Sequence, residues 1–368
     1  MRSPDPAASP VPPHQRLQAL TYGALLALIA GWVLHVGRDV FVPIVLAIVL
    51  VYVIVGLTRL LARIPGIGSR LSLRARYALS ALAAFAVLAL IAFVALDNLD
   101  RLAAQSGQYQ GALLATIQRL AVRFGVENEP TWATLRQLFL EQVSIQSLVG
   151  STVLAATSIL STVIVVLLYV VFLLAEQRWL NAKIDRVSES ARTVALIRQI
   201  IARTNARIGS YLALKALLGL LMAVLSFAIM RYYELEFAAF WAMLILLLNF
   251  VPYLGSIMSI FFPATMAIVQ FTDTGTVVAL VLALIAVQFV IGNFLDPYLL
   301  GNSLNLSPFS ILASLTVWSA LWGAPGALLA VPITAIMTIA FSEFAGTRPI
   351  AVLLSRTGEL NEDTRKRT

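Results

Sequence analysis

Long apolar runs separated by short polar segments set the pattern of this chain. Five such runs, at 17–36, 40–61, 77–96, 150–175 and 209–230, are each at least as long as the roughly 20 residues that a membrane-spanning helix needs. The first 230 residues are therefore predicted to form five membrane helices. A lysine within the fifth run, Lys215, is expected to extend its ammonium group toward the membrane surface along its flexible stem.

The pattern changes after residue 236. Residues 237–342 contain no Lys or Arg, and their only acids are Asp273 and Asp296. Two stretches, 237–271 and 307–341, flank a shorter one at 276–292 and are too long for one ordinary span, with Pro and Gly near their middles. We predict that each of the two forms a broken, re-entrant helical hairpin, with a single crossing as the alternative. The fold class is an all-α polytopic membrane protein with about eight membrane segments.

Polar segments divide the chain further. A Pro-rich start predicts a disordered tail, and two segments with apolar residues at helical spacing predict an insert of two amphipathic helices (109–124 and 132–143) and a basic surface helix. The expected units are a tail at 1–16, three membrane helices at 17–96, an external insert at 97–148, a fourth membrane helix at 149–175, the amphipathic helix at 176–208, a transport core at 209–342 and a second tail at 343–368.

Basic residues concentrate in alternate connections. The loop at 62–76 and the segment at 176–208 are both rich in Arg, and Lys and Arg accumulate in cytoplasmic loops of membrane proteins. This distribution predicts cytoplasmic N- and C-termini and an external insert. It also accounts for the net charge of +8 without a nucleic-acid partner.

Composition excludes most other classes of function. Among 368 residues, 60% are hydrophobic and 12% charged, against about 25% charged in soluble proteins, and the mean hydropathy is +0.89. There are no cysteines and two histidines, so thiolate and His-based metal sites are not expected. Motifs for nucleotide binding, zinc proteolysis or a serine nucleophile are missing from the sequence. We therefore expect no cofactor, no metal and no enzymatic activity.

Polar residues within apolar membrane sequence are the best functional candidates, because each is costly there unless it faces protein or water. The candidate pathway residues are Asp296, Asn293, Asn249, Gln288, Asn302 and Asn305. Residues that end or loosen helices are candidate hinges and gates: Pro252, Gly255, Pro297, Gly301, Pro308, Gly323, Pro325, Gly326 and Pro332. A structural alternative for Asp296 is that its carboxylate caps the following helical turn.

One short pattern occurs twice. Residues 249–255 read NFVPYLG, and residues 293–301 read NFLDPYLLG, with an added Asp296 and one added Leu. Many transporters contain two related halves whose broken helices meet near the middle of the membrane. The repeat favours such an internal echo, with chance recurrence in a restricted alphabet as the alternative.

These motifs resemble the autoinducer-2 exporter family of bacterial membrane proteins. The resemblance rests on NFVPYLG (249–255), NFLDPYLLGNSLNLSP (293–308) and WGAPGALLAVP (322–332), and it extends in layout over residues 17–345. It implies a permease-like homo-oligomer in the bacterial inner membrane with about eight membrane segments. It also implies export of a small polar solute such as autoinducer-2, although some members are described as cation/proton antiporters.

Three functions follow as hypotheses. The first is a secondary transporter that exports a small polar solute by alternating access, with 237–342 moving against the first five spans. The second is a Na⁺(Li⁺)/H⁺ antiporter in which Asp296 titrates. The third is a membrane scaffold that binds partners through 97–148 and 176–208 without transporting anything.

Overall fold

The computed structural model describes residues 13–65, 67–123, 145–301, 304–344 and 346–360, and every regular element in these ranges is helical. The helices are α1 (Pro13–Val36), α2 (Arg38–Arg63), α3 (Ile67–Arg70), α4 (Leu73–Arg123), α6 (Ile145–Asp185), α7 (Ala191–Tyr232), α8 (Ala238–Leu248), α9 (Leu254–Gln270), α10 (Thr274–Val290), η1 (Ile291–Leu295), α11 (Asp296–Leu300), α12 (Pro308–Glu343) and α13 (Arg348–Leu354). Six segments are long and apolar enough to cross a membrane: Arg38–Arg63, Leu73–Asn98, Leu160–Gln177, Ala191–Tyr232, Thr274–Leu300 and Pro308–Glu343. The predicted polytopic all-α membrane protein is confirmed.

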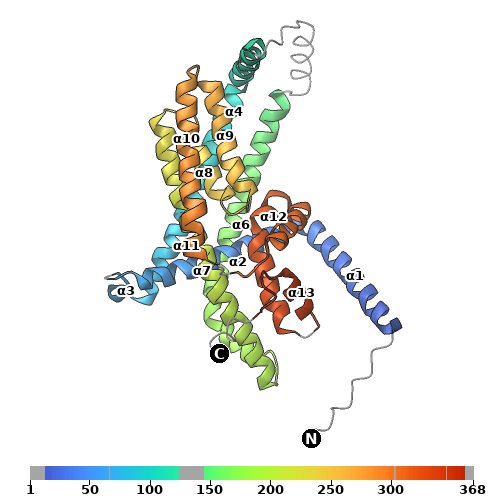
Figure 1. The fold of residues 1–368 in the computed structure, drawn as a ribbon. Coiled ribbons are helices and arrows are strands. Elements are labelled where there is room, and N and C mark those ends of the chain that lie inside the picture. The colour runs from blue at the N-terminus through green and yellow to red at the C-terminus, as the bar shows by residue number, and fades with distance from the viewer. Residues whose placement is uncertain (1–12, 66, 124–144, 302–303, 345, 361–368) are drawn as a thin grey trace.

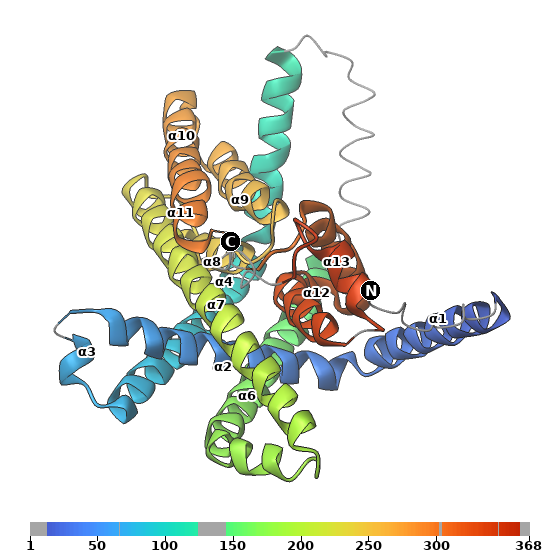
Figure 2. The same cartoon turned by 60° about the horizontal axis from the view of Figure 1, so that its bottom comes forward.

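α2 lies at the centre of the fold and crosses α4, α6 and α7 at a steep angle (Figures 1 and 2). Ile54 of α2 and Val170 of α6 are fully buried in the same apolar cluster. On its other side α2 approaches α7 at Gly56, where an added Cβ would collide with the carbonyl oxygen of Gly209. Small residues allow such close helix crossings in membranes, so α2 and α7 form a rigid junction.

α1 extends away from the helical body (Figures 1 and 2). Its apolar part, Thr21–Val36, is one of three shorter apolar helices, and most of its side chains are exposed. Only its end is held, because Trp322 Nε1 donates a hydrogen bond of 2.9 Å to the Leu34 carbonyl on this helix. An apolar helix with exposed sides suits contact with lipid. Residues 1–12 of the expected N-terminal tail lie outside the described residues.

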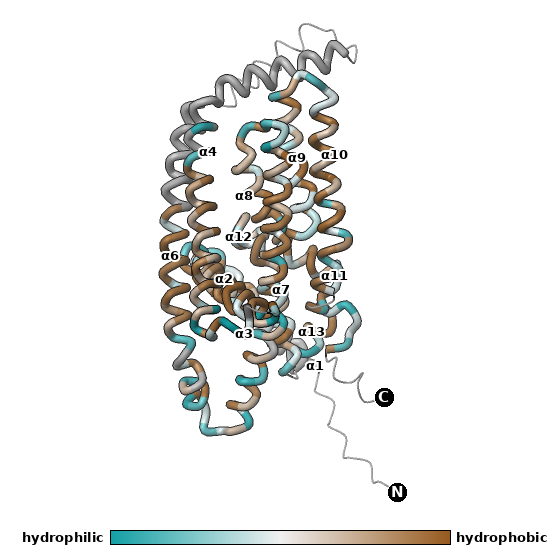
Figure 3. The backbone as a smooth tube through the Cα atoms, turned by 90° about the vertical axis from the view of Figure 1, so that its left-hand side faces the viewer, coloured by the Kyte–Doolittle hydropathy of each residue, from teal (hydrophilic) through white to brown (hydrophobic). Residues whose placement is uncertain are grey.

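α4 and α6 run side by side along their apolar parts (Figure 3). α4 continues from its apolar part, Leu73–Asn98, to Arg123 in one helix. The first amphipathic pattern of the expected insert thus continues a membrane helix. The second pattern, at 132–143, lies outside the described residues.

The polar segment at 176–208 differs from the single helix that its periodicity predicted. α6 ends at Asp185, and α7 begins at Ala191 after a turn. Ser190 stops the chain from continuing as one helix, because its side chain accepts a hydrogen bond from Thr193 N and caps α7. An ion pair between Arg198 and Asp185 then joins the two helices across the turn.

The stretch 237–271 forms a hairpin, as predicted. α8 and α9 pack against each other on either side of a break at residues 249–253 (Figure 1). Gly255 allows the close approach, since a Cβ there would collide with the Leu248 carbonyl oxygen. Pro252 lies in the break, where its missing N–H is not needed by a helix.

The second copy of the repeated pattern behaves differently. Thr274–Leu300 is one continuous helical span in which α10 passes through the π-helix η1 into α11. The prediction that the apolar segment stops at residue 292 was therefore wrong. The echo at 249–255 and 293–301 is shared in sequence but not in backbone structure.

The stretch 307–341 also folds back on itself. α12 bends at Gly323, whose φ of 65° and ψ of −140° are not helical. The two arms meet: Trp318 Nε1 lies 3.3 Å from Thr334 Oγ1, 16 residues further along the chain. In a straight helix these residues would be about 24 Å apart. Gly326 permits the contact, because an added Cβ would collide with the Trp318 carbonyl oxygen. The second stretch therefore also has the backbone of a hairpin, and that either hairpin is re-entrant in a membrane stays a prediction.

Charged residues gather at the two ends of the molecule. In Figure 3 the turn between α6 and α7, α3 and α13 lie toward the lower end, where the chain is hydrophilic around an apolar middle. This end carries the basic residues Arg63, Arg70, Arg74, Arg186, Arg192 and Arg348. At the opposite end a cavity of about 510 Å³ between α4, α7 and α8 is lined by residues of both charges, including Asp97, Arg101, Arg231, Glu234 and Glu236. The two ends therefore differ in charge as the two sides of a membrane protein do.

Candidate functional site

The described part of the chain contains one ion pair that is largely removed from solvent. Lys215 Nζ of α7 lies 2.6 Å from Asp296 Oδ2 of α11, and the two side chains are 12% and 21% exposed. Asp296 Oδ1 is buried and accepts no hydrogen bond from any described residue. The pair joins α7 to the π-bulged span and leaves one carboxylate oxygen open to a further cationic or hydrogen-bonding partner.

A second polar group meets the same turn of α7. Asn249, at the C-terminal end of α8, donates a hydrogen bond of 3.3 Å from its amide to the Lys215 carbonyl. Gly219, one helical turn after Lys215, leaves room for that amide, since an added Cβ would lie 2.9 Å from Asn249 Nδ2. Tyr211 lies one turn before Lys215 on the same helix. These α7 residues are spaced by four, so they share one face of the helix.

The π-helix places Asp296 against α7. In η1 the Asp296 N–H donates to the carbonyl of Ile291, five residues back, in place of the usual four. Pro297 follows at once and has no N–H to continue the ladder. π-bulges of this kind are frequent at functional sites because they reorient one side chain within a helix.

Asp296 does not cap the following turn, so that alternative was wrong. The residue itself is helical, with φ −54° and ψ −57°, and α11 has no side-chain capping hydrogen bond at its start. Its carboxylate instead bonds Lys215. The local spacing of Asp and Pro favoured a cap, but the partner that decides the geometry comes from a helix 81 residues away in sequence.

Lys215 does not extend to the membrane surface either. Its ammonium group is directed to Asp296, because a paired charge is far less costly within the fold than an unpaired one. The sequence signal was present, since a lone Lys in an apolar span is a candidate for function. Its partner could not be predicted from spacing, and neither could the role of Gly219.

Asp273, the other acid of the 237–342 region, has a structural role. It caps α10 and accepts hydrogen bonds from the Thr276 hydroxyl, the Thr276 N–H and the Gly275 N–H. These bonds stabilise the carboxylate and lower the pKa of Asp273, with the Thr276 hydroxyl as the largest cause. This carboxylate is fully committed to its own helix, in contrast to Asp296.

The remaining candidate amides lie in other surroundings. Asn293 is exposed and donates to the Phe289 carbonyl of its own helix, while Gln288 is half-buried on α10. Asn305, with φ 48°, donates to the Glu359 carbonyl and so ties the start of α12 to the segment after α13. Asn302 lies outside the described residues. The structure brings together Asp296 and Asn249, but not Asn305, at the ion pair.

The candidate hinge residues fall at distinct points of the backbone. Pro252 and Gly255 shape the α8–α9 turn, Pro297 and Gly301 begin and end α11, and Pro308 begins α12 after its Ser307 cap. Gly323, Pro325 and Gly326 lie at the bend of α12, and Pro332 is buried in its second arm. Gly301 (φ 50°) and Gly323 have positive φ with open space around them, so both suit sites of bending.

Comparison with known proteins agrees with this architecture. Residues 22–346 match the model of the AI-2E family transporter. A Haemophilus influenzae protein named "Putative transport protein" is 30% identical over 243 residues, which cover 66% of this chain and 68% of that protein. The "AI-2 transport protein TqsA" of Escherichia coli is 28% identical over 261 residues, covering 70% and 72%. A Borreliella burgdorferi protein, also named "Putative transport protein", is 31% identical over 195 residues, which span about half of each chain (53% and 54%).

The family match and the fold lead to one assignment. The matched region includes every apolar span described above and all residues of the Lys215–Asp296 centre. The chain therefore belongs to the AI-2E transporter family and is a multi-pass bacterial membrane transporter.

Proposed function

We propose that this protein is a secondary transporter that exports a small polar solute by alternating access, and that the Lys215–Asp296 pair couples its moving parts. The buried pair is the observation that carries this proposal. It links α7, which packs firmly on α2, to the π-bulged span of the predicted moving region. Lacking any nucleotide-binding motif in its sequence, the protein would draw its energy from a gradient.

The free-energy cost of separating Lys215 from Asp296 would couple the movement of α11 to binding at Asp296. Removing one partner of a buried ion pair costs about 3–5 kcal/mol, because the other charge is left uncompensated. α11 can therefore leave α7 readily only when a proton, a cation or a polar group of the solute compensates Asp296. Movement then depends on binding, which is what a coupled transporter requires.

Two hairpins are suited to act as gates. The α8–α9 turn contacts α7 through Asn249, and α12 bends at Gly323, where a positive φ and open space permit rotation. The basic end of the molecule, with the α6–α7 turn and α3, is assigned to the cytoplasm under this proposal. Both termini would then be cytoplasmic, and solute would leave at the end that contains Asp273.

The experiment is release of loaded autoinducer-2 from proteoliposomes, chosen because an E. coli relative is named for its transport. Lys215→Gln and Asp296→Asn each leave one charge unpaired and are expected to lose stability by about 3–5 kcal/mol. The double variant Lys215→Gln/Asp296→Asn replaces the pair with two amides that can still bond, so it should regain folding. Its release rate should nevertheless fall at least tenfold.

Asp273→Asn is the matched control. It makes the same change of charge in the same region, and Asn caps helices as well as Asp does, so release should be unchanged. A folded double variant that releases solute at the wild-type rate would show that the ion pair has no part in transport.

A second candidate function is cation/proton antiport. Asp296 Oδ1 is buried and accepts no hydrogen bond from a described residue, so it offers a carboxylate oxygen to Na⁺ or Li⁺. A pH-sensitive dye inside the same vesicles, under an imposed Na⁺ gradient, tests this directly. Na⁺-dependent proton movement that the double variant lacks would favour antiport, whereas a silent dye with continued autoinducer-2 release would favour solute export alone.

A further inference from the structure

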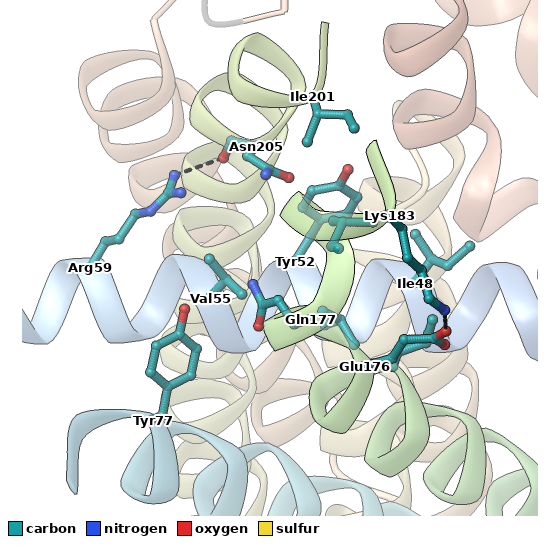
Figure 4. Close-up of a pocket in the computed structure, with 13 residues that line it drawn as sticks. Ile48, Tyr52, Val55, Arg59, Tyr77, Glu176, Gln177, Lys183, Ile201 and Asn205 are labelled. Atoms are coloured by element: carbon teal, nitrogen blue, oxygen red, sulfur yellow. Dashed lines mark hydrogen bonds and ion pairs between the residues drawn. The ribbon is translucent and has the colours of Figure 1, made fainter. Parts of the chain in front are cut away.

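A second polar feature of the membrane region lies apart from the ion pair. A cavity of about 330 Å³ opens between α2, α4, α6 and α7 (Figure 4). Each of the four helices supplies one neutral polar side chain to its lining: Tyr52, Tyr77, Gln177 and Asn205. Aliphatic side chains, among them Val55, complete the wall. Cavities of about 300–1,000 Å³ with a few convergent polar groups are typical of small-molecule sites.

The charged groups of the cavity leave one positive charge without an acidic partner among the described residues. Arg59 Nη1 donates a hydrogen bond of 2.8 Å to the Asn205 carbonyl, and Lys183 pairs with Glu176 at the rim (Figure 4). The Lys183 and Glu176 side chains are 58% and 53% exposed, so they border the opening and do not form its floor. Lys183 and Glu176 compensate each other, so Arg59 alone can meet a negative charge on a ligand.

The neutral groups, in contrast, are free. The hydroxyls of Tyr52 and Tyr77 and the amides of Gln177 and Asn205 make no hydrogen bond with another described residue. In Figure 4 Tyr52 and Asn205 reach the cavity from different helices, with Gln177 between them and Tyr77. Each hydroxyl and each amide can both donate and accept. Four such groups around one space match a solute that carries several hydroxyls.

A second cavity further along α4 and α7 has a different lining. The groove of about 250 Å³ between α4, α7 and α8 is lined only by apolar side chains, including Leu90, Phe227 and Met243. Such a lining suits a hydrocarbon chain of a lipid. The two cavities share α4 and α7 as walls, so the polar groups of the first are not a general feature of these helices.

We propose that the cavity at Tyr52, Gln177 and Asn205 is the loading site for a small polyhydroxylated solute with at most one negative charge. This inference rests on the proposed transport function and adds where its solute binds. Aliphatic side chains would pack on the carbon skeleton, while the four free groups bond its hydroxyls. The opening lies beside the Lys183–Glu176 pair near the basic end, which is the cytoplasmic end under that proposal.

α7 connects this cavity to the ion pair. Asn205 and Lys215 lie on the same helix, and ten residues span about 15 Å. Between them α7 crosses α2 at Gly209, where an added Cβ would lie 3.6 Å from the Tyr52 carbonyl oxygen of the facing helix. A solute in the cavity therefore contacts both helices of the rigid junction that holds Lys215.

The test is calorimetric titration of the purified full-length protein in detergent. D-ribose and ribitol serve as five-carbon polyhydroxylated probes. Glycerol 3-phosphate serves as an anionic probe that resembles a lipid headgroup. Ribose or ribitol should bind. Tyr52→Phe and Asn205→Ala each remove one bonding group and should weaken binding about threefold to tenfold. The Asn205 backbone carbonyl that Arg59 contacts is kept. Tyr232→Phe is the control, because Tyr232 is 81% exposed and remote from the cavity lining.

The outcomes separate this inference from the proposed function. Binding of ribose or ribitol that weakens about threefold to tenfold in both cavity variants, with folding intact, supports the loading site even if vesicles show no flux. Flux of autoinducer-2 that Tyr52→Phe/Asn205→Ala leaves unchanged, together with no binding of either sugar probe, overturns the site but leaves the transporter standing. Binding of glycerol 3-phosphate alone would identify a lipid-headgroup site and also overturn it.

Discussion

Asn249–Gly255 and Asn293–Gly301 share a sequence pattern but not a structure. In the first, α8 ends and the chain turns back into α9, so Pro252 lies in a hairpin loop. In the second, the helix continues through a π turn, and Pro297 lies in the first turn of α11. Similar residues thus reverse the chain direction between α8 and α9 but form only a π-bulge between α10 and α11.

The number of residues before the proline accounts for the difference. Asn293 precedes Pro297 by four residues, whereas Asn249 precedes Pro252 by three. The added Asp296 can donate its N–H to the Ile291 carbonyl before the proline interrupts the ladder. Its carboxylate then pairs with α7, which holds the bulge in place. One inserted residue supplies both a backbone donor and a charge.

Of the changes that test this comparison, the one in the α8–α9 hairpin has the largest predicted effect. Gly255→Ala puts a Cβ into the Leu248 carbonyl oxygen, a backbone atom that cannot move aside without parting α8 from α9. We expect a loss of stability of about 3 kcal/mol, at the upper end for overpacking. The measurement is the thermal unfolding midpoint of the purified protein in a mild detergent.

Gly292→Ala, directly before the second copy, is the matched control. Gly292 is helical, and an added Cβ would approach nothing closer than the Gln288 amide at 3.9 Å. Ala should therefore be neutral or stabilise by up to about 1 kcal/mol. An equal loss at Gly292 would mean that the effect of Gly255→Ala does not come from the close contact between α8 and α9.

Much of the fold could be predicted from apolar periodicity and helix breakers. The helical membrane class and both hairpins followed from the length of each apolar stretch and the Pro/Gly break in its middle. The length of an apolar stretch and the position of a Pro or Gly within it are local properties, so both can be read directly from the sequence. Candidate residues were found in the same way, because a polar side chain in apolar sequence is conspicuous.

Contacts between distant helices could not be predicted in this way. Asp296 was singled out, but its partner Lys215 was assigned to the membrane surface because a single sequence does not show which helices face each other. The turn at Ser190 was missed because apolar spacing continued across it, while a single cap decided the backbone. Asn249 and Asn293 were treated alike, although only Asn249 contacts α7.

The two asparagines provide the next prediction. Asn249→Ala removes the hydrogen bond to the Lys215 carbonyl and leaves a gap beside Gly219, so stability should fall by about 1 kcal/mol. Asn293→Ala removes only an exposed bond to its own helix and should change stability by less than about 0.5 kcal/mol. Unfolding midpoints of both variants, compared in one detergent, check the difference. A larger loss of stability for Asn293→Ala than for Asn249→Ala would contradict this prediction, because it would mean that the second copy makes the more important contact.

The smallest predicted effects have opposite signs at the two tyrosines. Tyr253 has φ 60° and ψ −60°, a conformation that glycine adopts far more readily, and its side chain is 54% exposed. Tyr253→Gly should relieve that strain and leave stability unchanged or raised by up to about 1 kcal/mol. Tyr298 is helical and 84% exposed, so Tyr298→Gly should lower stability by about 0.5–1 kcal/mol. Because both substitutions remove the same exposed ring, the sign of the difference in unfolding midpoint reports backbone conformation alone. Equal losses at both positions would mean that residue 253 is helical too, and the hairpin would no longer distinguish the first copy from the second.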